Sequence, residues 1–116
     1  MQTHINVKKK VAGDILIFEF HGELDETNVD NTFTIIKQEI ASSGTKKLIF
    51  NFIGLMYLNS KSIGYVADIY QNMEDNGGKF YLCYLSSNVR DTLDLVGITS
   101  IITVLETEEK ALQQLL

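Results

Sequence analysis

Residues 47–64 constrain the fold of this chain more than any other stretch, because they place a buried strand directly before a helix. Leu48 to Ile53 is an apolar run interrupted only by Asn51, which is typical of a strand buried on both faces of a parallel sheet. From Ser62 onward, apolar residues recur every three or four positions, which predicts an amphipathic helix that ends at Gly77 and Gly78. The residues of its apolar face are Ile63, Val66, Ala67, Tyr70 and Met73.

The short loop between this strand and this helix carries Asn59, Ser60 and Ser62. The first backbone N–H groups of a helix have no partner inside the helix, and the helix dipole favours negative charge at that end. A hydroxyl in this place is therefore suited to carry a phosphate whose charge the helix stabilises. We expect the function of the chain to centre on Ser60.

The sequence of the amino-terminal third of the chain predicts a hairpin followed by a helix. The hairpin strands are expected at 4–11 and 15–20, with a turn at 12–14, and Gly22 is expected to end the second strand. A segment rich in helix-starting residues follows and predicts a helix. The apolar face of that helix consists of Val29, Phe33, Ile36 and Ile40.

The last third continues the alternation of strands and helices. Residues 79–85 predict a second buried strand and residues 101–105 a last strand, with a short helix between them and another at the end of the chain. The residues expected to point inward are Val89, Leu93 and Val96 in the short helix, and Ala111, Leu112, Leu115 and Leu116 in the terminal one. A hairpin followed by alternating strands and helices predicts an α/β fold with a mixed sheet.

Length, charge and hydropathy favour a single domain that neither binds nucleic acid nor inserts into a membrane. The 116 residues predict one domain, residues 1–116, whose core needs neither disulfides nor metal. The net charge of −5 opposes a nucleic-acid backbone, so we expect no nucleic-acid partner. The only basic run, at 8–10, fits a solvated edge strand better than a nucleic-acid patch. The polar amino terminus, 1–4, and the lack of an apolar run of about 20 residues predict a cytoplasmic protein that does not insert into a membrane.

No set of residues predicts an enzyme, a metal site or a cofactor site. His4 and His21 lack the spacing of a zinc site and have no nucleophile beside them, so each is expected to be a surface or hydrogen-bonded side chain. Asp25 and Glu26 precede a predicted helix, which favours capping over acid–base chemistry. Cys83 is the single cysteine and lies in an apolar strand, which predicts an inert core thiol.

Five segments of the chain form a recognisable set. They are Gly22-Glu23-Leu24-Asp25, the strand Leu48 to Phe52, Tyr57 to Gly64, Gly77-Gly78-Lys79, and the leucine-rich element Val89 to Ile98. Together they resemble the anti-sigma factor antagonists, the single-domain members of the STAS family, over nearly the whole chain. The resemblance implies an α/β fold with a STAS-type mixed β-sheet, an N-terminal hairpin and about four helices packed mainly on one face.

In that family the first serine after the central strand is phosphorylated, and the resemblance places Ser60 at that position. It implies a protein that binds an anti-sigma factor serine kinase while unphosphorylated and thereby releases a sigma factor. Phosphorylation by the kinase ends the binding, and a phosphatase restores it. ATP and magnesium belong to the kinase, so the chain itself needs no cofactor. The partner-binding residues that the resemblance implies are Asp25, Asn59, Ser60, Lys61, Ser62 and Ile63.

The chain departs from the family pattern at three positions around Ser60. Asn59 replaces an aspartate, Lys61 a second hydroxyl residue, and Ser62 the glycine at the start of the helix. Losing a carboxylate and gaining an ammonium makes the loop more positive by about two charges, which favours a phosphate electrostatically. The same changes alter what a kinase must recognise.

Other interpretations of these residues stay open at the level of sequence. Ser60 fits a simple helix N-cap, Ser62 is a second candidate acceptor, Lys61 fits a solvated side chain, and Asp25 fits a helix cap. A second function is an accessory or scaffold subunit of a transporter or stress-signalling complex, without phosphorylation. An enzyme with an unrecognised site ranks behind both.

Overall fold

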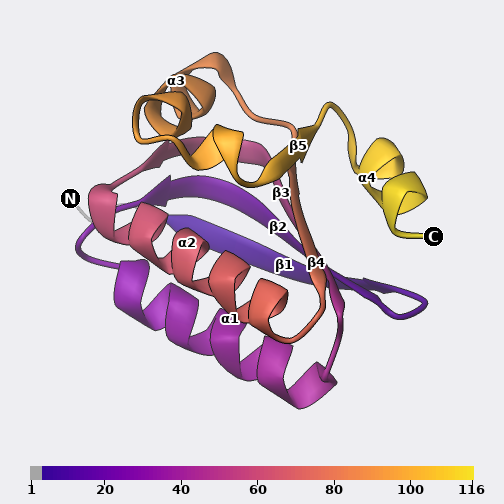
Figure 1. Ribbon diagram of the computed structural model, residues 1–116. Coiled ribbons are helices and arrows are strands. Elements are labelled where there is room, and N and C mark those ends of the chain that lie inside the picture. The colour runs from indigo at the N-terminus through magenta and orange to yellow at the C-terminus, as the bar shows by residue number, and fades with distance from the viewer. Residues whose placement is uncertain (1–3) are drawn as a thin grey trace.

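The computed structural model describes residues 4–116 and shows a five-stranded mixed sheet in the order β1-β2-β3-β4-β5 (Figure 1). Strands β1 (Ile5–Ala12) and β2 (Ile15–Leu24) form the antiparallel hairpin. Strands β3 (Lys47–Leu58), β4 (Lys79–Cys83) and β5 (Thr103–Leu105) continue the sheet in parallel with β2. The expected mixed α/β fold is confirmed, and β3 is its central strand. Met1 to Thr3 of the amino terminus lie outside the described part.

Four α-helices connect or follow the strands. Helices α1 (Val29–Ser43) and α2 (Ser60–Asp75) lie side by side over one face of the sheet (Figure 1), and α3 (Ser87–Leu95) closes the same core together with the short 3-10 helix η1 (Ile98–Ser100). Helix α4 (Glu108–Leu115) packs on the opposite face. The helices therefore lie mainly on one face, as the sequence predicts.

The alternation of side chains along β3 divides the core between the two faces. Leu48, Phe50 and Phe52 point toward α1 and α2, whereas Ile49 packs with Ala111 of α4. The ring of Phe20 in β2 lies 5.0 Å from the rings of both Phe50 and Phe52. Burial of each such side chain stabilises the fold by about 1.5–3 kcal/mol, so β3 fixes the position of the helix that follows it.

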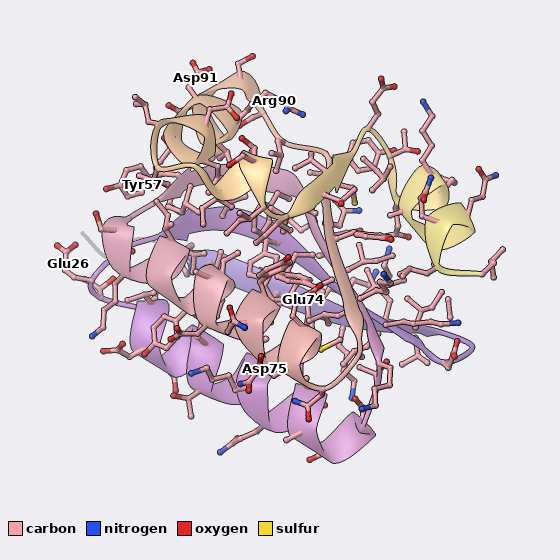
Figure 2. All side chains as sticks on the ribbon, viewed as in Figure 1. Glu26, Tyr57, Glu74, Asp75, Arg90 and Asp91 are labelled. Carbon is pink, nitrogen blue, oxygen red and sulfur yellow. The ribbon has the colours of Figure 1, made fainter. Side chains whose placement is uncertain are left out.

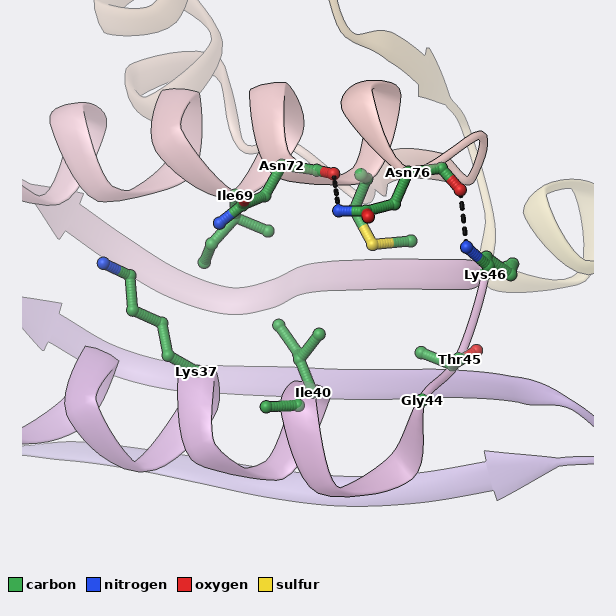
Figure 3. A pocket seen from close by; sticks show the side chains of 10 residues that line it. Lys37, Ile40, Gly44, Thr45, Lys46, Ile69, Asn72 and Asn76 are labelled. Carbon is green, nitrogen blue, oxygen red and sulfur yellow. Dashed lines mark hydrogen bonds between the residues drawn. The ribbon is translucent and has the colours of Figure 1, made fainter.

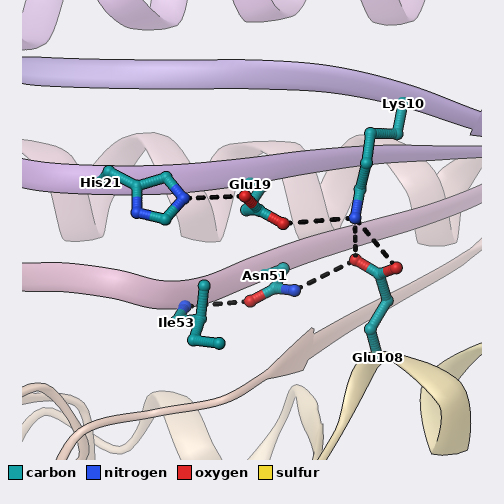
Figure 4. Close-up of polar contacts among 6 residues, drawn as sticks. All are labelled: Lys10, Glu19, His21, Asn51, Ile53 and Glu108. Carbon is teal, nitrogen blue, oxygen red and sulfur yellow. Dashed lines mark hydrogen bonds and ion pairs between the residues drawn. The ribbon is translucent and has the colours of Figure 1, made fainter.

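A polar cluster ties α4 to the sheet (Figure 4). Asn51, only 3% exposed, donates to Glu108 Oε1 at 3.0 Å and accepts from the backbone N–H of Ile53 at 2.9 Å. Lys10 donates to the same Glu108 carboxylate at 2.8 Å and to Glu19 at 3.2 Å. Because Glu108 satisfies its amide, Asn51 can interrupt the apolar run of β3 without leaving a buried polar group unpaired.

Several expected strand bounds are wrong, including the end of β3, which is expected at Ile53 and observed at Leu58. Strand β2 continues past Gly22 to Leu24, because Gly22 adopts a φ of 117° there and a Cβ at this position would lie 2.1 Å from the carbonyl oxygen of His4. Strand β4 ends at Cys83 and not at Leu85, since Tyr84 takes a left-handed φ of 57° that breaks the extended backbone. Strand β5 is correspondingly shorter than expected and begins at Thr103.

Several side chains differ from their expected environment, among them Ile53, which is 54% exposed although its strand is expected to be buried on both faces. Val96 is 57% exposed and Leu116 is 93% exposed, because each follows the last residue of its helix and so leaves the apolar face. In the basic run on edge strand β1, Lys8 and Lys9 are exposed as expected, but Lys10 is half-buried in the cluster with Glu108. Among the helices of residues 4–116, none is long and apolar enough to cross a membrane.

Candidate functional site

Ser60 is the first residue of α2 and lies one residue beyond the end of β3, so the expected loop is reduced to Asn59 alone. The strand runs this far because β2 and β3 stay paired to Leu24 and Leu58, and the Asn59 N–H donates to the Leu24 carbonyl oxygen at 3.1 Å. Ser60 is exposed, and its hydroxyl makes no hydrogen bond within residues 4–116. The hydroxyl therefore stands free at the start of a helix.

Asn59, and not Ser60, caps α2. Its side-chain oxygen accepts from the backbone N–H of Ser62 at 2.9 Å and from the Ser62 hydroxyl at 2.6 Å, and its carbonyl oxygen accepts from the N–H of Ile63 at 3.2 Å. The alternative in which Ser60 is the N-cap is wrong. Ser62 is 0% exposed, so its hydroxyl is engaged and inaccessible in the folded protein.

Asp25 lies next to Asn59 because it follows Leu24, whose carbonyl oxygen binds the Asn59 backbone. Its carboxylate accepts from the backbone N–H of Thr27 at 2.9 Å and from the Thr27 hydroxyl at 2.6 Å. The N-cap position of α1 belongs to Asn28, so the Asp25 side chain organises the turn before α1 and does not cap the helix itself. The structure thus brings Asp25 and the start of α2 to the same edge of the sheet.

Lys61 is exposed but paired. Its ammonium lies 2.9 Å from the carboxylate of Asp30 in α1, and the hydroxyl of Tyr65 donates to the same carboxylate at 2.7 Å. These two contacts, the Tyr65 hydrogen bond first, hold the pKa of Asp30 below its usual range, and Asp30 raises the pKa of Lys61. Lys61 is therefore more than a solvated side chain, because it links the first turn of α2 to α1.

Ile63 is half-buried and packs against the main core, so only part of it is available to a partner. Exposed apolar surface lies instead on the last residues of β3, where Met56 is 68% and Tyr57 46% exposed. Asn88 of α3 donates to the Met56 carbonyl oxygen at 2.9 Å and joins α3 to this edge. Figure 2 shows Tyr57 and Glu26 projecting from the end of the molecule where α2 begins.

Met56 and Asn88 were not identified from the sequence. A signal for Met56 was present, since Met56 and Tyr57 are adjacent large apolar residues and an extended strand can bury only one of two neighbours on a single face. No local pattern indicates Asn88, because its contact with Met56 joins residues that are 32 positions apart.

The geometry suits an added anion. The N–H groups of Ser60 and Lys61 lie in the first turn of α2, where a helix offers them no internal acceptor. A phosphate on Ser60 would lie beside these N–H groups, in the favourable field of the helix N-terminus. The arrangement therefore favours a negative charge at this position.

The other titratable residues of interest lie elsewhere. His21 is an exposed side chain whose Nε2 lies 2.7 Å from Glu19 on the face of the sheet that carries α4 (Figure 4). Cys83 is buried, and burial raises the pKa of its thiol to about 12. Within the described residues, His, Cys, Asp and Glu form no group of three or more that could hold a metal ion.

The fold and this edge of the sheet define a class of protein. Residues 6–111 match the family model of the STAS domain, and the chain belongs to this family. An anti-sigma F factor antagonist from Paenibacillus polymyxa is 24% identical over 101 residues, which cover 87% of this chain and 86% of that protein. The resemblance to anti-sigma factor antagonists is thereby confirmed.

Solved structures share the fold. An anti-sigma factor antagonist from Mycobacterium paratuberculosis superposes with a TM-score of 0.86 at 17% identity and covers 96% of this chain and 93% of its own. The anti-sigma factor antagonist SpoIIAA in its unphosphorylated form gives a TM-score of 0.82 at 22% identity and covers 95% of this chain and 96% of its own. At these identities the structures show a common fold.

Proposed function

We propose that this chain is a cytoplasmic anti-sigma factor antagonist that works as a phosphorylation switch. The unphosphorylated protein binds an anti-sigma factor serine kinase and releases a sigma factor, phosphorylation of Ser60 ends the binding, and a phosphatase restores it. The chain contributes no catalytic residue, and ATP and magnesium are bound by the kinase. The observation that carries the proposal is the exposed, unbonded hydroxyl of Ser60 at the N-terminus of α2.

A switch of this kind has a precedent in the fold. SpoIIAA has been solved in an unphosphorylated and in a phosphorylated form, with TM-scores of 0.82 and 0.73 to this chain. These structures support the idea that a protein of this shape carries a phosphate without a change of fold. For the present chain the acceptor that fits best is Ser60, because Ser62 is fully buried and bonded to Asn59.

The proposed partner-binding face combines Asp25 with Asn59, Ser60, Lys61 and the half-buried Ile63, whereas Ser62 of the expected set is fully buried. A phosphate adds about −1.5 to −2 charges at neutral pH, and burying it in an interface built for a neutral hydroxyl costs on the order of several kcal/mol. Binding and phosphorylation at Ser60 are therefore mutually exclusive. This exclusion converts a single covalent change into release of the partner.

The departures from the family pattern are coupled in the structure. Asn59 retains the capping role of the aspartate it replaces, because its amide oxygen accepts the same kind of bond from the Ser62 backbone. The Ser62 hydroxyl, where the family has glycine, adds a second bond to that oxygen. Lys61 is held by Asp30 and lies one residue from the acceptor. None of the three changes removes the exposed hydroxyl of Ser60.

Calorimetry with the partner tests the switch. The partner is first recovered by a pull-down from native lysate, and Ser60→Ala and Ser60→Asp are then titrated against it. We expect Ser60→Ala to bind like the wild type and Ser60→Asp to bind at least tenfold more weakly. Ser42→Asp, an exposed serine near the end of α1, is the matched charge control and should bind like the wild type. Equal affinities for the two Ser60 variants would argue for a constitutive scaffold.

A scaffold or accessory subunit of a stress-signalling or transporter complex is the second candidate. A chain of the stressosome, described as a signal integration and transduction hub, shares the fold with a TM-score of 0.71 at 19% identity. Exposed Met56 and Tyr57 would suit permanent packing in such an assembly. This candidate leads if neither the wild type nor Asn59→Asp combined with Lys61→Ser accepts phosphate from a kinase encoded beside the gene.

A further inference from the structure

Helix α1 borders a groove of about 400 Å³ on each of two opposite sides. The groove toward α2 has the two helices as its long walls (Figure 3). The other groove lies between α1 and β1, which is the first strand of the sheet order and therefore an edge strand. Its apolar lining residues are Ile5, Val7, Phe18, Ile35 and Ile36. This second groove thus runs along an edge of the sheet.

The outer edge of β1 is unpaired. Within residues 4–116, β1 pairs with β2 alone. The Glu23 N–H donates at 2.9 Å to the carbonyl oxygen of His4, which continues the register of the hairpin, so the even-numbered residues of β1 bond to β2. The backbone groups of the odd-numbered residues consequently point outward, and they have no hydrogen-bond partner in the described part of the chain. These residues are Ile5, Val7, Lys9 and Val11.

The side chains of the same residues lie on the face of the sheet that carries α1. Ile5 and Val7 pack against the main core, and the Lys9 ammonium lies 2.6 Å from the Glu39 carboxylate of α1. Ile35 of α1 also lines the groove and is 51% exposed. Because side chains alternate along a strand, a further strand paired with β1 would direct every second side chain into this groove. The edge therefore fits an extended segment with apolar side chains on one face.

The lysines of β1 determine which charge such a segment can carry. Lysine on an edge strand normally discourages pairing. Two of the three lysines, Lys9 and Lys10, are already paired with Glu39 and Glu108 at 2.6 and 2.8 Å. Lys8 is exposed on the face opposite α1 and has no carboxylate within 4.0 Å among residues 4–116. An acidic side chain opposite Lys8 on an added strand would neutralise it.

A second copy of the chain fits this edge less well than an acidic segment does. Centred antiparallel pairing of two β1 strands would place Lys8 of one copy opposite or diagonal to Lys8 of the other. Like charges at these cross-strand positions destabilise a pair of strands. The sequence of β1 thus disfavours self-pairing.

We infer that the free edge of β1 binds an extended segment of a partner protein in which apolar and acidic side chains alternate. The backbone of the segment bonds to the outward groups of Ile5, Val7 and Lys9. Its apolar side chains enter the groove beside Ile35, and an acidic side chain on its other face pairs with Lys8. The site holds a partner independently of the proposed switch at Ser60.

Titration of the ¹⁵N-labelled full chain with a blocked peptide that alternates valine and glutamate, followed by NMR, tests the site. Saturable shifts and slower hydrogen exchange are expected at the outward amides of Ile5, Val7 and Lys9. An analogue with lysine in place of glutamate should bind at least tenfold more weakly, as should an analogue with proline at its central valine. Equal binding of either analogue, or shifts that leave β1 unaffected, would overturn the inference.

Variants assign the binding to the edge and to its charge. Val7→Pro removes an outward N–H that β2 does not use, so it should keep the fold in thermal unfolding and weaken peptide binding at least tenfold. Lys8→Glu should reverse the preference, so that the lysine analogue binds better than the glutamate peptide. Ile35→Ser should weaken binding, whereas Ile53→Ser, at a similarly exposed isoleucine of β3, should leave it unchanged.

Two further outcomes are decisive. Lys8→Glu stays informative even if Val7→Pro fails to fold, and an unchanged preference in Lys8→Glu would contradict the charge assignment. Sedimentation of the chain alone should show a monomer, and a dimer that Val7→Pro dissociates would show that a second copy occupies the edge instead. The titration contains neither kinase nor phosphate, so failure here is distinguishable from failure of the phosphorylation switch.

Discussion

The side-chain oxygen of Asn59 accepts two hydrogen bonds from Ser62, one from the backbone N–H at 2.9 Å and one from the hydroxyl at 2.6 Å. These two hydrogen bonds distinguish Ser62 from Ser60, although both serines are candidate phosphate acceptors in the sequence. Ser62 is buried and has a structural role, whereas Ser60 is exposed and has none within the described residues. A residue whose removal leaves the fold intact is free to serve as a switch.

Ser60→Ala and Ser62→Ala should therefore differ in stability. We expect Ser62→Ala to lower the free energy of unfolding by about 1–2 kcal/mol, because it removes a fully buried hydrogen bond. Ser60→Ala should change it by no more than about 0.5 kcal/mol. Urea unfolding followed by circular dichroism measures both. A larger loss for Ser60→Ala than for Ser62→Ala would contradict the assignment of roles.

Asn59 variants test the cap of α2. Asn59→Ala should cost about 1 kcal/mol or more, since neither the Ser62 N–H nor its hydroxyl would keep an acceptor. Asn59→Asp should be at least as stable as the wild type, because aspartate caps equally well and its charge is favoured at a helix N-terminus. Thermal unfolding at low salt is the measurement. A loss of stability in Asn59→Asp equal to that in Asn59→Ala would show that the cap is not the source of the effect.

Two glycine variants test the close approach of Gly22 in β2 to the start of β1, with Gly64 in α2 as the comparison. Gly22→Ala should lower the free energy of unfolding by more than about 2 kcal/mol, because its Cβ would lie 2.1 Å from the His4 carbonyl oxygen at a φ of 117°. Gly64→Ala, in α2, has no atom within 4 Å of the new Cβ and should stabilise by about 0.5–1 kcal/mol. Chemical denaturation of both variants gives the comparison, and a neutral Gly22→Ala would contradict the described geometry.

Cys83 should resist thiol reagents until the protein unfolds. Burial raises its pKa to about 12 from an ordinary value of 9.0, so its thiolate fraction at about pH 8 is roughly a thousandfold smaller than in the unfolded chain. As the pH rises, the unfolded chain loses the thiol proton near pH 9.0, whereas the folded protein keeps it until about pH 12. The contribution of the buried thiol to the free energy of unfolding is therefore fully present below pH 9.0 and is lost between pH 9.0 and about 12. Rates of modification by a disulfide reagent with and without urea measure the difference. Comparable rates would show that the thiol is accessible.

The sequence was sufficient to predict the order of the elements and the position of Ser60 at the start of a helix. Both follow from local signals, namely the apolar run at Leu48–Ile53 and the helical spacing after Ser62. The same signals did not distinguish Asn59 from Ser60 as the cap, because both residue types cap helices well. Only the paired strand ends, Leu24 and Leu58, fix where α2 begins.

Other features depend on contacts between distant residues. In the sequence, Asn51 interrupts an apolar strand without an evident reason. The reason is its hydrogen bond to Glu108, which lies 57 positions away and is brought close only by the fold. Helical spacing also assigned Val96 to a buried face although α3 ends at Leu95, since periodicity does not mark the last residue.

Phosphorylation of the purified protein by the kinase recovered with it tests the central claim most directly. The wild type, Ser60→Ala and Ser62→Ala are incubated with that kinase, ATP and magnesium, and intact mass and phosphopeptides are then recorded. The account predicts one phosphate on the wild type and on Ser62→Ala, mapped to Ser60, and none on Ser60→Ala. Equal phosphorylation of Ser60→Ala, or a phosphate mapped to Ser62 in the wild type, would contradict it.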